Sequence, residues 1–411
     1  MRIQVLIQVL AVLFLCTIST SAFQSLSGSL SGSLSVSARP LHLFSTSSLS
    51  SSNDNGNNDL NNDLNNDNIS ALQHPVPSLR SIQSAIEDLR NFDASRKHKL
   101  VSRGESSMTR IWDLQTWSRH QNANRYWRHL VKWPMSTTVR IVFPVVLSFV
   151  AWAIVFHNVR KRFLPNFTFD IAPLSLISSA VALLLTLRTN QSLGRLQEAR
   201  LAWGRLVLHS RDLSSLLASY ISPSQAEICG RHLLLLGWSL KARLRGEAED
   251  DVIKLSLPPS DAEYIMSQRR RTVALLRRIR LIVASEVEDN NLDGSAHEAI
   301  LLRFHELNAC IGVSERLLGS PSPPTYTRHT SRVLLSWLAL VPLGLESMSL
   351  SLPLICLWTT IVAYVMVGID EIGVQLEQPF QLLPLNSLSA ALMRDVVDEI
   401  EEGLKLKETH K

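Results

Sequence analysis

The sequence predicts an all-α membrane protein with four transmembrane helices and a large helical region exposed to water. Four apolar segments that carry few charges are long enough to cross a bilayer, at about 138–157, 171–188, 331–347 and 352–369. Between the second and third segments, apolar residues recur at helical spacing. The chain shows neither the alternation of a half-buried strand nor a glycine-rich phosphate loop.

The composition agrees with a chain that lies partly in lipid and partly in water. Of its 411 residues, 45% are hydrophobic and 19% are charged, which is too many charges for a protein wholly within lipid. The net charge is +5, and the arginines gather beside the apolar segments, which argues against a nucleic-acid partner. The four cysteines are Cys16, Cys229, Cys310 and Cys356. Their spacing is not that of a metal site, so neither a zinc site nor a disulfide framework is expected.

The first part of the chain has the composition of a targeting sequence. Residues 1–22 contain an early arginine and then an apolar run, which is typical of a secretory signal peptide. Residues 23–52 are serine-rich and contain no acid, as in an organelle transit peptide. With Phe23 at the junction, the two together resemble the bipartite plastid presequence of algae with secondary plastids. A secreted protein with a serine-rich linker is the alternative. Residues 53–75 predict a disordered, Asn/Asp-rich linker before a domain over 76–405.

Four expected spans leave both termini and the segment 188–330 on the same side of the membrane. Most of the arginines and lysines near the spans lie on that side, which favours a stromal or cytosol-like compartment for it. Asp170 stands just before the second span, where an acid suits a helix N-terminus. Glu346 stands between the third and fourth spans and is expected to be solvated in a hairpin.

Several motifs occur along residues 110–400 in a fixed order. They are DLQTWSRH (113–120) with RYWRHL (125–130), LRTNQS…EARLAWG (187–204), PPTYTRHTSR (323–332) followed by Trp337, and GIDEIGVQLEQPF (368–380). In this order they resemble the bestrophin family of anion channels, in the branch of bacterial homologues and plant thylakoid chloride channels.

The resemblance implies a homopentamer in which five copies of the second span line one pore. Its narrow neck would be formed by Ser179, Leu183 and Leu187. Side chains four residues apart stack on one face of a helix, so five copies would form three rings around the axis. Ser179 replaces the bulky apolar residue of the family, and Leu187 replaces its common phenylalanine, so the family's gating behaviour does not transfer closely.

The resemblance also points to polar residues around the neck. At the pore mouth and in the span-two motif they are Arg188, Asn190, Arg195 and Arg200. Arginines there either raise the local anion concentration or anchor the helix and pair with acids such as Glu198. The motif residues at span three and after span four are Tyr326, Arg328, His329, Arg332, Asp370, Glu371 and Glu377. These acids are too scattered for the calcium clasp of animal members, so no metal or cofactor is expected.

These observations together predict a passive anion channel and not an enzyme, because no HExxH, GxSxG or paired Cys/His motif is present. An apolar neck favours ions that shed water cheaply, such as chloride. We expect a chloride channel of a plastid membrane, most simply the thylakoid, that balances charge and tunes the proton motive force. A bicarbonate channel that supports carbon concentration and a non-conducting membrane scaffold are the alternatives. The expected partners are monovalent anions, membrane lipid and further copies of the chain.

Overall fold

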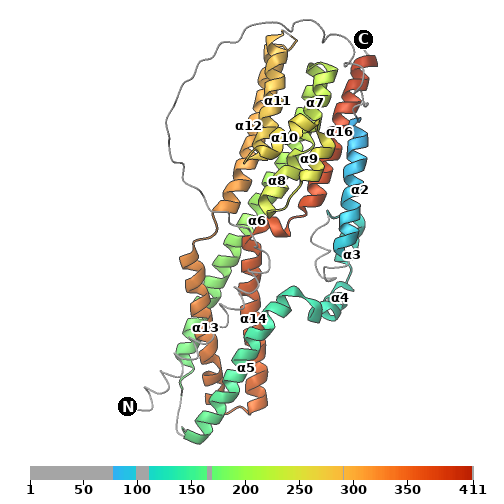
Figure 1. Ribbon diagram of the computed structural model, residues 1–411. Helices are drawn as coiled ribbons and strands as arrows, with labels where there is room; N and C mark the ends of the chain where they lie inside the picture. The colour runs from blue at the N-terminus through green and yellow to red at the C-terminus, as the bar shows by residue number, and fades with distance from the viewer. Residues whose placement is uncertain (1–76, 99–110, 164–168, 290, 410–411) are drawn as a thin grey trace, which may run out of the picture. The chain divides into compact units, whose positions relative to one another are not determined.

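The structure, a computed structural model, describes residues 77–98, 111–163, 169–289 and 291–409, and all regular elements in these ranges are helices (Figure 1). The chain divides at Pro77 into two units, and the described helices belong to the second, Ser78–Lys411. The predicted presequence and linker fall outside the described residues. The all-α prediction is confirmed for the part of the chain that the structure describes.

One group of helices contains the long apolar segments. It is formed by α5 (Thr137–Phe163), the first half of α6 (Ala172–Tyr220), α13 (Pro324–Ser347) and α14 (Leu352–Glu377), with α13 and α14 each packed against both α5 and α6 (Figure 1). Among the described residues, three helices are long and apolar enough to cross a membrane: α5 from Thr138, α6 and α14. They contain the predicted spans 138–157, 352–369 and all but the first residue of 171–188.

The helix α13, which contains the predicted span 331–347, is not among these three. Arg328 and Arg332 occupy its first turns and Glu346 its last, which shortens its uncharged stretch. Ten of its residues are buried by neighbouring helices, against four in α14. More residues are therefore buried in α13 than in α14, and its crossing of the membrane remains a prediction.

A second group of helices surrounds the other half of α6, with α12 and α16 packed along it (Figure 1). Its members are α7 (Pro223–Leu233), α8 (Leu236–Arg245), α9 (Asp250–Ser256), α10 (Pro259–Ser267), α11 (Arg271–Glu288), α12 (Gly294–Gly319) and α16 (Leu385–Thr409). The short helix α15 (Pro379–Leu382) connects α14 to α16. Before α5 the described chain forms α2 (Leu79–His98), α3 (Leu114–Gln121), α4 (Arg125–Lys132) and the 3-10 turn η1 (Trp133–Met135).

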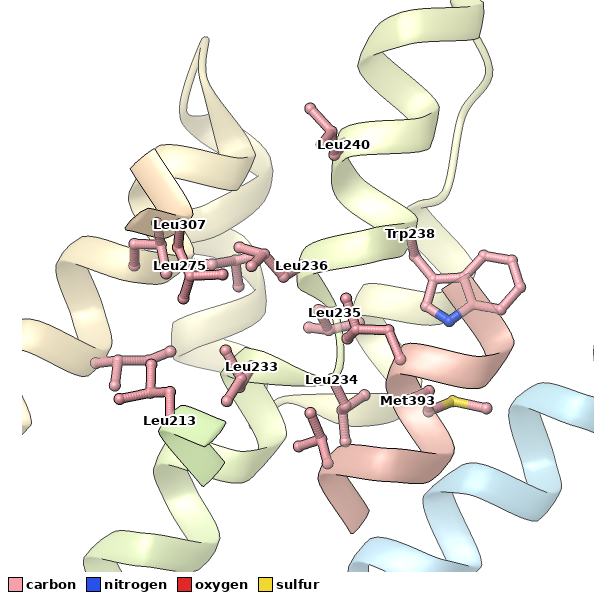
Figure 2. Packing of buried hydrophobic residues seen from close by; sticks show 14 of the residues in the cluster. Leu213, Leu233, Leu234, Leu235, Leu236, Trp238, Leu240, Leu275, Leu307 and Met393 are labelled. Carbon is pink, nitrogen blue, oxygen red and sulfur yellow. The ribbon is translucent and has the colours of Figure 1, made fainter. Parts of the chain in front are cut away.

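The core of this second group includes the run Leu233–Leu236, where α7 passes into α8 (Figure 2). All four leucines are fully buried, as are Leu213 of α6 and Met393 of α16. Burying one such side chain stabilises a fold by about 1.5–3 kcal/mol. The run has no polar member because the chain is enclosed on every side at this junction, and it fixes the second half of α6 to α16.

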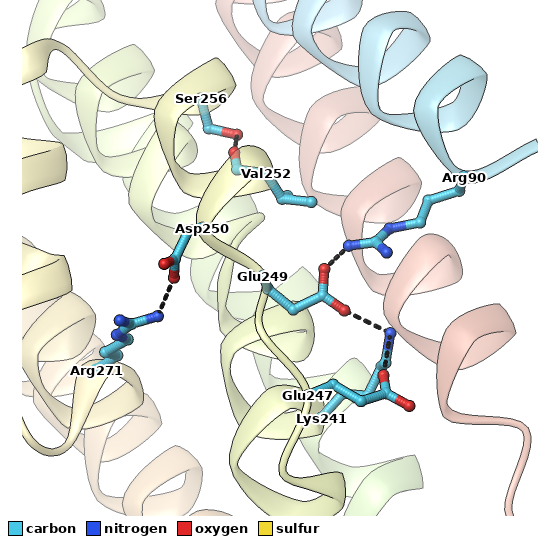
Figure 3. A network of polar contacts seen from close by, with 8 residues as sticks. All are labelled: Arg90, Lys241, Glu247, Glu249, Asp250, Val252, Ser256 and Arg271. Carbon is cyan, nitrogen blue, oxygen red and sulfur yellow. Dashed lines mark hydrogen bonds and ion pairs between the residues drawn. The ribbon is translucent and has the colours of Figure 1, made fainter. Parts of the chain in front are cut away.

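Beside this core the chain turns back on itself to form a buried ionic contact (Figure 3). Gly246, at φ 68°, ends α8 in the left-handed conformation that glycine adopts readily. The turn brings Glu247 and Glu249 back to Lys241, whose Nζ lies 3.1 Å from Glu247 Oε2 and 2.6 Å from Glu249 Oε1. Burial lowers the pKa of Lys241 to about 8, so its charge depends on the two carboxylates.

The same contact fixes α2 to the second group. Arg90 pairs with Glu249 (Figure 3). Its guanidinium also lies over the Trp238 ring, 4.8 Å from the ring centroid. The apolar side of α2 is buried at Leu79, Ile82 and Ile86. Glu249 therefore contacts two cations that come from α2 and α8, and it joins these helices.

We expect Glu249→Gln to lower the free energy of unfolding by about 3 kcal/mol, because it leaves two cations beside a neutral amide in a buried site. The measurement is thermal or denaturant unfolding of the detergent-solubilised protein, followed by tryptophan fluorescence. Glu247→Gln is the matched control, because the Glu247 side chain is 36% exposed and Lys241 keeps Glu249. Equal losses in the two variants would contradict this assignment.

Candidate functional site

The first half of α6 brings the three predicted neck residues to one exposed face. Ser179 is exposed, and Leu183 and Leu187 are 60% and 45% exposed. The Ser179 hydroxyl donates to the Leu176 carbonyl oxygen at 2.9 Å, so its hydrogen is used within the helix. These three positions therefore form an apolar surface, apart from the oxygen of one small hydroxyl group.

The opposite face of the same segment is covered by protein. Val181, Leu185, Arg188 and Ser192 follow one another at helical spacing, and all four are buried. The helix α6 contacts α13 and α14 in this region. A helix covered along one face and exposed along the other has a fixed orientation, so the side chains of the exposed face point in a defined direction.

Arg188 forms a buried ion pair. Its side chain is 4% exposed, and its Nη1 donates to Asp370 Oδ1 of α14 and, at 3.4 Å, to the Ser331 hydroxyl of α13. The Ser331 hydroxyl donates in turn to Asp370 Oδ2 at 3.5 Å. The sequence left open whether this arginine faces the pore mouth or pairs with an acid, and the geometry favours the pair. Arg188 joins three helices beside Leu187, the last residue of the predicted neck.

Arg195 donates to main-chain carbonyl oxygens. Its Nη2 lies 2.7 Å from the oxygen of Leu317 and its Nη1 2.7 Å from that of Ser320, both at the C-terminal end of α12. Its Nε lies 3.1 Å from the oxygen of Glu377. A cation at the C-terminal end of a helix is favourable because unpaired carbonyls collect there. Arg195 therefore connects α6 to the ends of α12 and α14.

Five further polar residues named from the sequence lie at the surface of this unit. Asn190 and Arg200 are exposed on α6, and Arg328, His329 and Arg332 are exposed on α13. Within the described residues these five side chains make no hydrogen bond or ion pair. Arg200 is therefore the member of the predicted pore-mouth arginines whose charge is not used by a neighbour.

Two hydrogen bonds hold α13 against the first half of α6, which contains the predicted neck residues. The Tyr326 hydroxyl donates to the Leu184 carbonyl oxygen at 3.2 Å, and the Trp337 indole N–H donates to that of Leu174 at 3.1 Å. At the start of α6 the Asp170 carboxylate accepts from the Ala172 N–H at 3.0 Å, so this acid lies beside the helix N-terminus, while Ile171 holds the N-cap position. These contacts fix α6 along the length of its apolar half.

The three acids after the fourth predicted span have separate partners. Asp370 pairs with Arg188, Glu371 accepts from Gln375 Nε2 at 2.9 Å, and Glu377 accepts from the Ser322 N–H at 3.0 Å. Across the described ranges no group of three or more His, Cys, Asp or Glu side chains is placed to hold a metal ion.

Glu346 is buried, so the expectation that it is solvated is wrong. Its side chain is 7% exposed; Oε1 lies 2.6 Å from Arg160 Nη1 and Oε2 3.1 Å from His157 Nδ1, both of α5. The partners stand 186 and 189 residues away, which the sequence alone does not relate. One feature of the sequence could have predicted this burial: Glu346 is a single acid in a long apolar segment. An acid in or near a membrane needs a partner.

The family model described as "Bacterial/Fungal Bestrophin protein" matches residues 116–398, which is more than half of the chain. The chain belongs to the bestrophin family. The matched range covers the predicted neck segment and the contacts of Arg188 and Arg195, so the resemblance stated from the motifs is confirmed.

Relatives and solved structures agree with this placement. The bestrophin described here is 26% identical over 348 residues to "Voltage-dependent chloride channel 2, chloroplastic" of Arabidopsis thaliana, covering 79% of this chain and 80% of the relative. It is 28% identical over 291 residues to a "Voltage-dependent anion channel-forming protein" of Ralstonia nicotianae, covering 68% and 94%. A crystal structure of a mutant bestrophin homologue from Klebsiella pneumoniae has the same fold, with a TM-score of 0.60, 24% identity, and coverage of 64% of this chain and 99% of that one.

We expect Arg188→Met to destabilise the protein by about 3–5 kcal/mol, because it leaves the Asp370 carboxylate enclosed without its cation. The measurement is the unfolding midpoint of the detergent-solubilised protein. Arg200→Met, on the same helix but exposed, should change stability by no more than about 0.5 kcal/mol. A stable Arg188→Met protein would show that the pair does not hold α6, α13 and α14 together.

Proposed function

We propose that this bestrophin is a passive anion channel that conducts chloride and assembles as a homopentamer. Membership of the family supports the proposal, as do relatives whose names describe chloride and anion channels. In the assembly, α6 of each copy lines the pore, and Ser179, Leu183 and Leu187 form its neck. Four membrane crossings per copy, with α13 as the third, complete the proposed topology.

The observation that carries the proposal is the exposed apolar face of α6. Leu183 and Leu187 are exposed on a helix whose other face is fixed by buried contacts with α13 and α14. A narrow apolar passage favours anions that lose water at low cost and opposes small, strongly hydrated cations. Such a passage needs no bound metal and no catalytic group, in agreement with a channel that acts passively.

Bicarbonate is a second candidate cargo, and Ser179 is the residue that favours it. A small hydroxylic side chain takes the place of a bulky apolar one at the first ring, and Leu187 carries no aromatic ring at the third. Both replacements leave more room for an ion larger than chloride. The two cargoes imply different roles: charge balance with tuning of the proton motive force for chloride, and carbon concentration for bicarbonate.

The proposed location is a plastid membrane, with the thylakoid as the expected one. The serine-rich, acid-free segment 23–52 after a signal-like segment 1–22 supports plastid import. Two similar proteins of Arabidopsis thaliana carry "chloroplastic" in their names. Imaging of the full-length chain with a C-terminal fluorescent tag tests the location, and a signal confined to the secretory pathway would contradict it.

Purified protein reconstituted into planar bilayers should carry a current that reverses near the chloride equilibrium potential. A chloride gradient opposed by bicarbonate then gives the permeability ratio of the two anions, which decides between the two cargoes. The same protein should elute from size exclusion as a pentamer in detergent. No current under either gradient would leave a non-conducting scaffold as the function.

We expect Leu183→Ala to raise the single-channel conductance or change the ratio of anion permeabilities, because the central ring of the neck becomes wider. Leu193→Ala is the matched control, since Leu193 is 39% exposed on the same helix but lies about 80° around it from Leu183. If both variants conduct as the unchanged protein does, the neck assignment is wrong.

A further inference from the structure

The helix α6 keeps one exposed face over both of its halves. Its 49 residues form a single unbroken helix, in which positions 18 residues apart are about five turns apart and point the same way. The buried pairs at this spacing include Val181 with Ala199, Leu185 with Trp203, Arg188 with Leu206 and Ser192 with Ser210. The covered face of the first half therefore continues as the covered face of the second half.

The exposed face continues in the same way. Leu183 and Leu201, 18 residues apart, are 60% and 64% exposed. Leu187 has its counterpart at Arg205, which is also exposed. Arg205 thus stands on the face of the predicted neck, about 27 Å further along the helix axis.

Among the cations of α6 that follow Leu187, Arg205 points most nearly in the same direction as Leu183 around the helix axis. Six residues of α6 between Leu187 and Arg205 point within about 60° of Leu183 around the helix axis. They are Asn190, Gly194, Gln197, Glu198, Leu201 and Gly204. Among these, Glu198 alone is charged, and it pairs with Arg316 of α12. Within the described residues Arg205 itself makes no hydrogen bond and no ion pair.

The acids that flank Arg205 on α6 and α12 lie beside other side chains. Asp212 lies 2.5 Å from Arg303, and Glu306 lies 3.7 Å from His209. The positive charge of Arg205 is therefore not cancelled by a paired carboxylate.

We propose that Arg205 forms a ring of positive charge in the water-filled part of the pore, beyond the apolar neck, and that this ring selects anions. The proposal rests on the proposed channel function, since it needs α6 to line the pore. A ring of unpaired guanidinium groups raises the local anion concentration and lowers that of cations. The apolar neck then sets how much water an ion must lose, and the Arg205 ring sets the sign of the ion that reaches it.

The test compares Arg205→Gln and Arg205→Glu with the unchanged protein in planar bilayers at 0.1 M and 1 M chloride. At the lower salt, Arg205→Glu should reduce the chloride conductance and the ratio of chloride to sodium permeability by about two- to tenfold, with Arg205→Gln between. At 1 M the difference should shrink, because the screening length falls from about 10 Å to about 3 Å. Arg205→Lys, which keeps the charge, should conduct as the unchanged protein does.

Arg200→Glu is the matched control, because Arg200 is exposed and unpaired on the same helix but lies off the exposed neck face. It stands about 100° around α6 from Leu183 and about 140° from Arg205, so its position on the helix does not support the pore-mouth role expected from the sequence. It should leave the permeability ratio near that of the unchanged protein. If the unchanged protein conducts anions and Arg205→Glu does so equally well, or if Arg200→Glu has the same effect, the Arg205 ring is wrong and the channel stands. If the unchanged protein carries no current, the proposed channel function itself fails.

Discussion

The structure depends on one constraint, which is that α6 is continuous through two groups of helices. An unbroken α-helix cannot change the direction of its faces between its ends, so the orientation fixed in the apolar half also holds in the other half. The buried residues at 18-residue spacing, such as Leu185 and Trp203, show that both groups pack against the same face. The opposite face is left exposed over both halves, and it contains the apolar positions Leu183 and Leu201.

The remaining contacts serve this constraint by holding α6 in place. Arg188 ties it to α13 and α14 through Asp370, and Arg195 ties it to the end of α12. Trp337 holds its first turns to α13. The arginines that follow the apolar half of α6 thus have two different roles. Arg188 and Arg195 are structural because they point into the protein, whereas Arg200 and Arg205 keep their charges at the surface.

Much of this arrangement follows from local sequence, and the rest depends on distant partners. Helical spacing predicts the helices on both sides of the neck, and the i, i+4, i+8 spacing places Ser179, Leu183 and Leu187 on one face without any knowledge of tertiary contacts. Local sequence does not reveal that Glu346 is buried, because its partners His157 and Arg160 come from α5. The same holds for Arg188, whose acid lies 182 residues away. Hydropathy does not settle α13 either, since its apolar residues are buried against protein more often than those of α14.

The most direct test of the continuous pore face is the reactivity of single cysteines placed along α6, in a protein where Cys356 is replaced by serine. Leu183→Cys and Leu201→Cys should both react with a membrane-impermeant, anionic methanethiosulfonate and change the current, because both lie on the exposed face. Val181→Cys and Ala199→Cys, on the covered face, should not react. Reaction of Val181→Cys and Ala199→Cys would contradict a continuous pore face on α6. Reaction of Leu183→Cys with lipid-soluble reagents alone would contradict it too, since α6 would then turn another face to the ion path.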